Sequence, residues 1–150
     1  MVRLIPGNEN WWRKPLALHK GRLLPAELVI LAMEVESGEE GAWLNSITVR
    51  SGAVDLIRTP VDGGKPAFKA KRTVLPDYVS EKLSQCYLAS NVKRGCPDLV
   101  IWGLKSKKIR LVEVKCPHWD SLSQEQESFM RTAMKYGIEV KTVEWEFSKI

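Results

Sequence analysis

The chain has 150 residues, of which 44% are hydrophobic and 27% are charged, an ordinary composition for a globular protein with one hydrophobic core. It contains no low-complexity tract, its first residues lack the apolar core of a secretory signal, and no apolar run approaches the roughly 18 residues that span a bilayer. We therefore expect an intracellular protein of the cytoplasm or nucleoid. The net charge of +5 and the pI near 9.2 favour a polyanionic partner.

The first half of the chain is predicted to contain one helix and three strands. Residues 1–22 show no clear periodicity, so we expect an irregular N-terminal segment followed by a single domain over residues 23–150. A helix is expected from Pro25 to about Ser37, because proline suits the first helical turn and apolar residues recur at helical spacing. A strand is expected over residues 42–50. A hairpin should follow over residues 53–74, where TPVDGGKP is a strong turn signal.

Beyond the hairpin, a second helix and two more strands are predicted. Asp77 can cap the helix, whose apolar face is expected to contain Val79, Leu83, Cys86 and Tyr87. Two strand-like runs then cover residues 98–103 and 108–115. The polar stretch LKSKK between them favours a hairpin turn.

The C-terminal part is predicted to be a helix and a strand. Ser121 or Ser123 opens the helix and Gly137 ends it. Its inward side chains are expected to be Phe129, Met130, Ala133 and Met134. A final strand covers IEVKTVEWEF. This order of elements predicts an α/β fold in which helices flank a mixed central sheet.

The two strand-like runs bring three charged side chains together. Side chains alternate between the faces of a strand, so Glu113 and Lys115 point the same way, about 7 Å apart. The hairpin sets Asp98 opposite them, and paired strands lie only about 4.8 Å apart. Two carboxylates that converge in this way repel each other and raise a pKa.

A divalent cation would remove this repulsion. Mg²⁺ takes oxygen ligands and keeps several waters for a substrate. The ammonium group of Lys115 could orient a metal-bound water or stabilise charge that develops on a phosphate. Together these groups suggest phosphodiester hydrolysis. A cross-strand ion pair between Lys115 and Asp98 or Glu113 is the structural alternative that the residues alone leave open.

The second half of the chain resembles the VRR-NUC domain of the PD-(D/E)XK nuclease superfamily on three segments: GCPDLVIW, LVEVK and SLSQEQ. It is particularly similar to the nuclease domain of Fanconi-associated nuclease, in which a GxPDLxxW segment is followed by VEVKGPxDRLSxxQ. The resemblance covers residues 95 to about 147. It implies a restriction-endonuclease-like core and a metal-dependent DNA nuclease.

The resemblance also implies a role for each matching residue. The metal-binding and catalytic positions are matched by Asp98, Glu113, the carbonyl of Val114 and Lys115. The two carboxylates and the carbonyl would bind Mg²⁺ or Mn²⁺, and the lysine would be catalytic. Gln126 matches the glutamine of the LSxxQ motif in the catalytic site, although with Ser123 it also forms a capping-box pattern.

The resemblance also implies a further acidic ligand from the first helix. Glu27 is our choice for this metal ligand, because it lies near the start of that helix. Glu34, two turns later on about the same face, is the alternative. For either residue, a solvated glutamate without a role in the site remains a third interpretation.

Three departures from the family pattern affect the loop after the lysine. Cys116 stands where the family commonly has glycine, and CPHWDSLSQ is one residue longer than the corresponding family segment. Ser121 takes the place of the usual arginine, which removes a cation that could contact phosphate. We expect activity to be retained, and any effect of these departures to fall on substrate preference.

Six basic residues are predicted to bind nucleic acid: Lys65, Lys69, Lys71, Arg72, Lys93 and Arg94. They would contact the phosphate backbone, which gives affinity and steep salt dependence but little sequence information. The resemblance implies DNA as the partner, with branched or flapped DNA as a hypothesis. A homodimer with paired active sites, acting like a Holliday-junction resolvase, is an alternative. The other alternative is a non-catalytic nucleic-acid-binding module on the same fold.

Overall fold

The computed structural model describes residues 1–11, 14–44, 52–60, 66–92, 95–118 and 121–149, and at residues 8–11, 14, 52–60 and 66–73 it describes the backbone alone. The elements in chain order are β1 (Val2–Trp11), β2 (Lys14–His19), β3 (Arg22–Pro25), α1 (Ala26–Glu34), β4 (Glu39–Leu44), β5 (Gly52–Pro60), β6 (Pro66–Thr73), α2 (Asp77–Ser90), β7 (Leu99–Gly103), β8 (Ile109–Lys115), α3 (Gln124–Lys135) and β9 (Glu139–Phe147). None of the helices in these ranges is long and apolar enough to cross a membrane.

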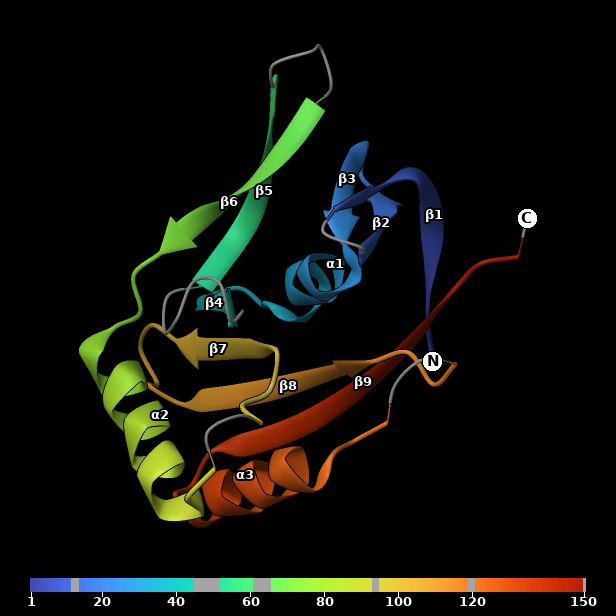
Figure 1. The fold of residues 1–150 in the computed structure, drawn as a ribbon. Coiled ribbons are helices and arrows are strands. Elements are labelled where there is room, and N and C mark those ends of the chain that lie inside the picture. Colours follow the sequence, from blue (N-terminus) through green and yellow to red (C-terminus); the bar gives the residue numbers. More distant parts are fainter. Residues whose placement is uncertain (12–13, 45–51, 61–65, 93–94, 119–120, 150) are drawn as a thin grey trace.

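The described strands form one mixed sheet of nine strands in the order β3-β2-β1-β9-β8-β7-β4-β5-β6 (Figure 1). β9 pairs in parallel with β8 on one side and with β1 on the other. The remaining neighbours are antiparallel. This arrangement confirms the prediction of an α/β fold with a mixed central sheet and flanking helices.

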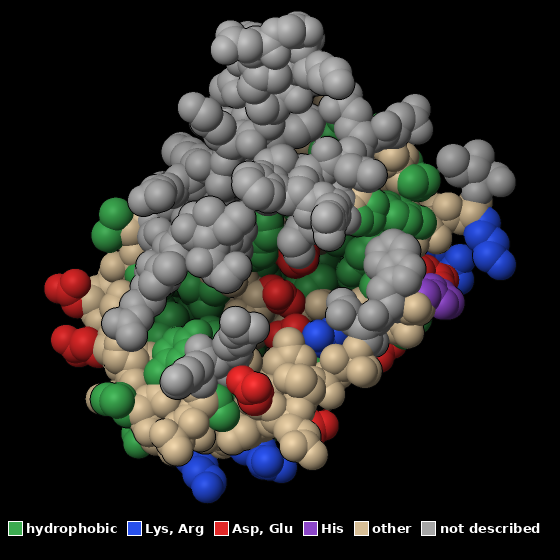
Figure 2. All heavy atoms as spheres, viewed as in Figure 1, with side chains coloured by type: hydrophobic (Ala, Val, Ile, Leu, Met, Phe, Trp, Pro, Cys, Tyr) green, Lys and Arg blue, Asp and Glu red, His purple; other side chains and the backbone are tan. Residues whose placement is uncertain are grey.

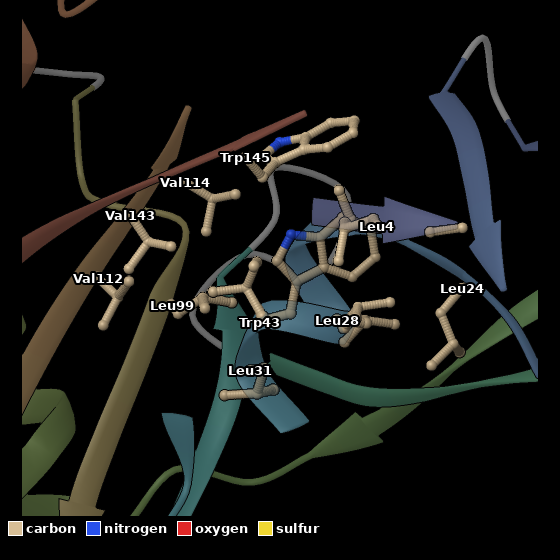
Figure 3. Packing of buried hydrophobic residues seen from close by; sticks show 14 of the residues in the cluster. Leu4, Leu24, Leu28, Leu31, Trp43, Leu99, Val112, Val114, Val143 and Trp145 are labelled. Carbon is tan, nitrogen blue, oxygen red and sulfur yellow. The ribbon is translucent and has the colours of Figure 1, made fainter. Parts of the chain in front are cut away.

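Two hydrophobic cores lie on opposite faces of the central strands. Val112 and Val114 pack with α1 in one core, and Leu111 packs with α2 and α3 in the other. This split follows from the alternation of side chains along β8. Figure 3 shows the first core, in which Trp43 lies among residues of α1, β7 and β8. All three helices are therefore fixed against the sheet by apolar contacts.

The N-terminal segment was expected to be irregular, and that expectation is wrong. Residues 2–11, 14–19 and 22–25 form β1, β2 and β3, and these three strands extend the central sheet beyond β9. β1 pairs with β9 through Val2 and Trp145, which lie near opposite ends of the chain. Pairing between strands so far apart in the sequence is difficult to predict from local sequence patterns. β1 also contains Pro6 and Gly7, which normally indicate turns.

The helix predictions hold with small corrections. α1 ends at Glu34, before the expected boundary near Ser37, and Pro25 occupies its N-cap position. Pro76, not Asp77, is the N-cap residue of α2. The carboxylate of Asp77 is instead in the first turn, where it faces the positive end of the helix dipole.

Met134 was expected to point inward from α3, but its side chain is 55% exposed. The buried residues of this helix are Phe129 and Ala133, one turn apart, whereas Met134 lies next to the C-terminal end. Gly137 has a φ of 78° and follows that end, as predicted for a helix stop. The strand predicted over residues 42–50 is observed as β4 up to Leu44, and residues 45–51 lie outside the described ranges.

Candidate active site

The open end of the β7–β8 hairpin carries the two predicted carboxylates. Leu99 pairs with Val112, and the same register continued by one residue sets Asp98 opposite Glu113. Asp98 accepts a hydrogen bond on Oδ2 from the backbone N–H of Val114 at 2.8 Å. The pairing of two largely buried, apolar strands therefore positions both acidic residues.

Carboxyl groups from three elements act on one another at this end of the hairpin. Burial raises the pKa of Asp98 well above its usual value, and the carboxylates of Glu113 and Glu27 raise this pKa further. The hydrogen bond from Val114 lowers it but does not outweigh these effects. A side-chain hydrogen bond with Glu113 also favours the protonated form of Asp98. Glu27 belongs to the first turn of α1.

Lys115 lies beside these carboxylates on the same face of β8 as Glu113. Its Nζ is 3.3 Å from Oε1 of Glu113, and both side chains are nearly enclosed, with exposed fractions of 11% and 2%. The ion pair that the residues alone left open is therefore present. It keeps a cationic group within the acidic site, where it partly balances the negative charge.

Gln126 makes two sets of contacts at the start of α3. Its Oε1 accepts a hydrogen bond from the backbone N–H of Ser123 at 2.9 Å, while the side chain of Ser123 accepts one from the N–H of Gln126 at 3.1 Å. Its Nε2 donates to Oε1 of Glu113 at 3.1 Å. The capping box and the contact with the site are thus served by opposite ends of one side-chain amide.

Gly95 explains why the loop before Asp98 can approach α3 so closely. Its φ is +118°, a conformation that L side chains rarely adopt. A Cβ at this position would lie 2.7 Å from the backbone carbonyl of Glu125 and 3.0 Å from the backbone nitrogen of Gln126. Glycine therefore permits the contact that brings the Asp98 loop and the Gln126 turn together.

Glu34, the alternative ligand from the first helix, lies in a different network. Its Oε1 is 2.7 Å from Nζ of Lys141, and its backbone carbonyl accepts a hydrogen bond from Arg110 at 2.9 Å. It lies seven positions after Glu27, a rise of about 10 Å along the helix. Glu27 is therefore the acidic residue of α1 whose charge acts on Asp98.

The donor set suits a hard divalent cation in charge and in atom type. Asp98, Glu113 and Glu27 offer carboxylate oxygens. Repulsion between these carboxylates contributes to the raised pKa of Asp98, and a bound cation would relieve it. A strand residue directs its N–H and C=O toward the same neighbour, so the carbonyl of Val114 faces the side on which Asp98 accepts its N–H. Among the described residues, however, no three His, Cys, Asp or Glu side chains are already placed to hold a metal ion.

The predicted DNA-binding side chains cannot be placed. Lys65, Lys93 and Arg94 lie outside the described residues, and Lys69, Lys71 and Arg72 belong to the part of β6 described by backbone alone.

The space-filling view shows acidic side chains and a basic one gathered in a hollow near the centre of the molecule (Figure 2).

One neighbour of the site was not predicted from the sequence. Burial raises the pKa of the Cys96 thiol to about 12, and the carboxylates of Glu113 and Asp98 also raise it. The thiol is therefore protonated at neutral pH and adds no charge to the site. Its position two residues before Asp98 is the only sequence signal, and no recognised pattern includes it.

Comparison with known proteins finds similarity over parts of the chain. The family model described as the VRR-NUC domain matches residues 61–145, more than half of the chain. Fanconi-associated nuclease 1 of Danio rerio is 47% identical over 47 residues, which cover 31% of this chain and 5% of the relative. A crystal structure of paFAN1 bound to 5′-flap DNA with a gap is 20% identical with a TM-score of 0.38, and the match covers 51% of this chain and 16% of that one. The chain thus spans only a small part of either relative.

Proposed function

Because the chain belongs to the VRR-NUC domain family, we propose that it is a metal-dependent DNA nuclease. The observation that carries this proposal is the convergence of Asp98 and Glu113, with Lys115 3.3 Å from the second carboxylate. A buried acidic pair could be neutralised by protons alone, but the matched family is named for its nuclease activity. The combination favours a site built for phosphodiester hydrolysis.

In this proposal, Mg²⁺ or Mn²⁺ is held by oxygen atoms of Asp98, Glu113 and the carbonyl of Val114. Glu27 binds directly or through a water. When bound, the cation lowers the pKa of a coordinated water and neutralises charge on the phosphate. The hairpin of β7 and β8 would supply the first three of these ligands, and the start of α1 would supply the fourth.

Lys115 positions the attacking water and stabilises negative charge on the scissile phosphate. The oxygen of that water bonds to phosphorus while one backbone P–O bond breaks, leaving a phosphate monoester and a hydroxyl group. Gln126 holds Oε1 of Glu113, so that Lys115 can exchange this contact for the substrate without releasing the carboxylate. In this proposal, Gln126 keeps Glu113 in place while Lys115 turns to the substrate.

The partner in this proposal is DNA, bound mainly through phosphate contacts. β5 and β6 form a long hairpin that projects from the sheet (Figure 1), and β6 contains the basic positions 69, 71 and 72. One crystal structure similar to part of this chain contains 5′-flap DNA. We propose branched or flapped DNA as the preferred substrate, within the cell. A homodimer with two active sites would suit a four-way junction.

A cleavage assay on labelled single-stranded, duplex, 5′-flapped and four-way-junction DNA tests this function. Each substrate is incubated with Mg²⁺, Mn²⁺ or EDTA. Cutting that requires a divalent cation supports the nuclease, and the best substrate identifies its preferred structure. Salt-sensitive binding with no cutting in any metal would instead support a binding module that keeps the fold without the chemistry.

A further inference from the structure

The positive charge of this chain is concentrated in its first 25 residues. They contain five Lys or Arg residues and one glutamate, a formal charge of +4, although they lie outside the segment that matches the family model. The remaining 125 residues contain 18 basic and 17 acidic residues, so they are almost neutral. A polyanion would therefore be attracted to the N-terminal strands more than to the rest of the protein.

The β2–β3 hairpin presents part of this charge at its tip. His19 pairs with Arg22, and Lys20 and Gly21 form the turn with positive φ values of 50° and 77°. Lys20 and Arg22 are both exposed. Arg3 of β1 adds a further charge, 3.2 Å from Glu146 in an ion pair. The exposure of Lys20 and Arg22 makes the tip accessible to a polyanion.

The position of this tip relative to the site is determined by chain continuity. β3 leads directly into α1, and Glu27 is two residues beyond the end of β3. Arg22 at the start of β3 is about 10 Å from Pro25 at its end. The helix that carries Glu27 contacts β2 and β3, and it also contacts β5 of the other hairpin. Figure 1 shows the two hairpins on either side of α1.

We propose that the tip of the β2–β3 hairpin, through Lys20 and Arg22, is a second contact surface for the phosphate backbone of a DNA arm. It rests on the proposed nuclease function and adds a surface that the family match does not include. The basic β5–β6 hairpin holds the DNA on one side of α1, and the β2–β3 tip holds it on the other. DNA crossing between them passes the end of α1 at which Glu27 meets the active site.

Exposed cations at a turn suit phosphates better than they suit a protein partner. A phosphate contact requires an accessible positive charge and releases a condensed counterion, and it needs no apolar area. A stable protein interface would require a largely apolar buried centre, and the described tip residues are Lys20, Gly21 and Arg22. The predicted signature is therefore a strong dependence of affinity on salt.

The test measures binding of a fluorescein-labelled 5′-flapped duplex by anisotropy in EDTA, where no cutting occurs, over a series of salt concentrations. The double variant Lys20→Ala with Arg22→Ala is compared with wild type. We expect its affinity to fall about tenfold at low salt, and the slope of log K against log salt to shrink by about 2, close to 0.9 for each phosphate contact. Lys20→Ala alone should shrink the slope by about 1. Because this single variant changes only an exposed turn residue, it remains informative if the double variant folds poorly.

The matched control is Lys105→Ala with Lys108→Ala. These exposed lysines lie at the turn of the β7–β8 hairpin, at the opposite end from Asp98. The control should bind DNA within about twofold of wild type, since it removes no proposed phosphate contact. If the wild type binds and cuts DNA, two results would overturn this inference and leave the proposed function standing. One is an unchanged affinity and slope for the tip variants, and the other is an equal loss in the control. A wild type that does not bind DNA would overturn the proposed function as well.

Discussion

Gln126 on α3 donates a hydrogen bond from Nε2 to Oε1 of Glu113 on β8 at 3.1 Å. The same carboxylate oxygen lies 3.3 Å from the ammonium group of Lys115. The helix start and the central strand are therefore joined through one acidic group. The stability of the helix end and the chemistry of the site can be separated by substitutions that remove one contact of Gln126 at a time.

Ser123→Ala removes the helix cap and leaves the hydrogen bond from Gln126 to Glu113. Gln126→Glu removes that hydrogen bond and leaves the cap. A glutamate at position 126 can still accept from the backbone of Ser123, as in a capping box, but it cannot donate to Glu113. We expect Ser123→Ala to lose about 1 kcal/mol of stability with kcat nearly unchanged. Gln126→Glu should lower kcat at least about tenfold, through an added negative charge beside Glu113. Equal kcat values in the two variants would contradict the contact proposed for Gln126.

Gly95→Ala should disturb both stability and activity. The added Cβ would meet the backbone of Glu125 at 2.7 Å, and the φ of +118° would be strained for alanine. We expect a loss of about 2–4 kcal/mol in urea unfolding, together with a lower kcat, because the Asp98 loop must move away from α3. Gly137→Ala is the matched control, since its φ is +78° with no atom within 4 Å of a Cβ. If both variants lose the same stability, the close approach at Gly95 is unimportant.

Arg110 anchors the C-terminal end of α1. It donates to Oε2 of Glu39 at 2.8 Å and to the carbonyl of Glu34 at 2.9 Å, and its side chain is only 16% exposed. Arg110→Leu leaves two acceptors unpaired and should cost about 1–3 kcal/mol in urea unfolding. Lys141→Ala breaks a pair whose lysine is 48% exposed, so it should cost less than about 1 kcal/mol. A larger loss for Lys141→Ala would mean that the ion pair, and not Arg110, fixes the helix.

Metal-free protein should become less stable as the pH rises through the pKa of Asp98. This pKa is raised in the folded state, so between its ordinary and raised values the folded state binds more protons than the unfolded state. The free energy of unfolding therefore falls as the pH increases in this range, and the full stabilisation is present only below the ordinary value. Urea unfolding in EDTA from about pH 4 to pH 8 measures this trend, which Asp98→Asn should remove.

Glu39 provides a control of opposite sign for that titration. Its pKa is lowered, chiefly by the hydrogen bond from Arg110, so its contribution to stability is present above the ordinary value and is lost as the pH falls through the lowered one. The free energy of unfolding of Glu39→Gln should therefore fall less than that of wild type as the pH drops below the ordinary pKa of a glutamate. Parallel stability curves for wild type and Asp98→Asn would contradict the assignment of a raised pKa to Asp98.

The convergence of these side chains was largely predictable because they are close in sequence. Asp98, Glu113 and Lys115 lie on one hairpin, whose register follows from its turn, and Gln126 begins the next element. The strands of residues 2–25 were not predictable in the same way, because β1 depends on pairing with β9 at the other end of the chain. Glu27 was preferred over Glu34 for its place near the start of the helix. The structure adds that the charge of Glu27 acts on Asp98, whereas Glu34 pairs with Lys141.

Single-turnover cleavage by two matched variants tests the central claim most directly. The chain contains two Pro-Asp pairs: Asp98 is at the end of the hairpin, and Asp77 is an exposed residue in the first turn of α2. On the best-cut DNA with saturating Mg²⁺, Asp98→Asn should reduce the cleavage rate at least about 100-fold, because a metal-binding carboxylate is lost. Asp77→Asn should cut at nearly the wild-type rate. Cleavage by Asp98→Asn at the wild-type rate, or an equal loss in both variants, would contradict an active site at Asp98, Glu113 and Lys115.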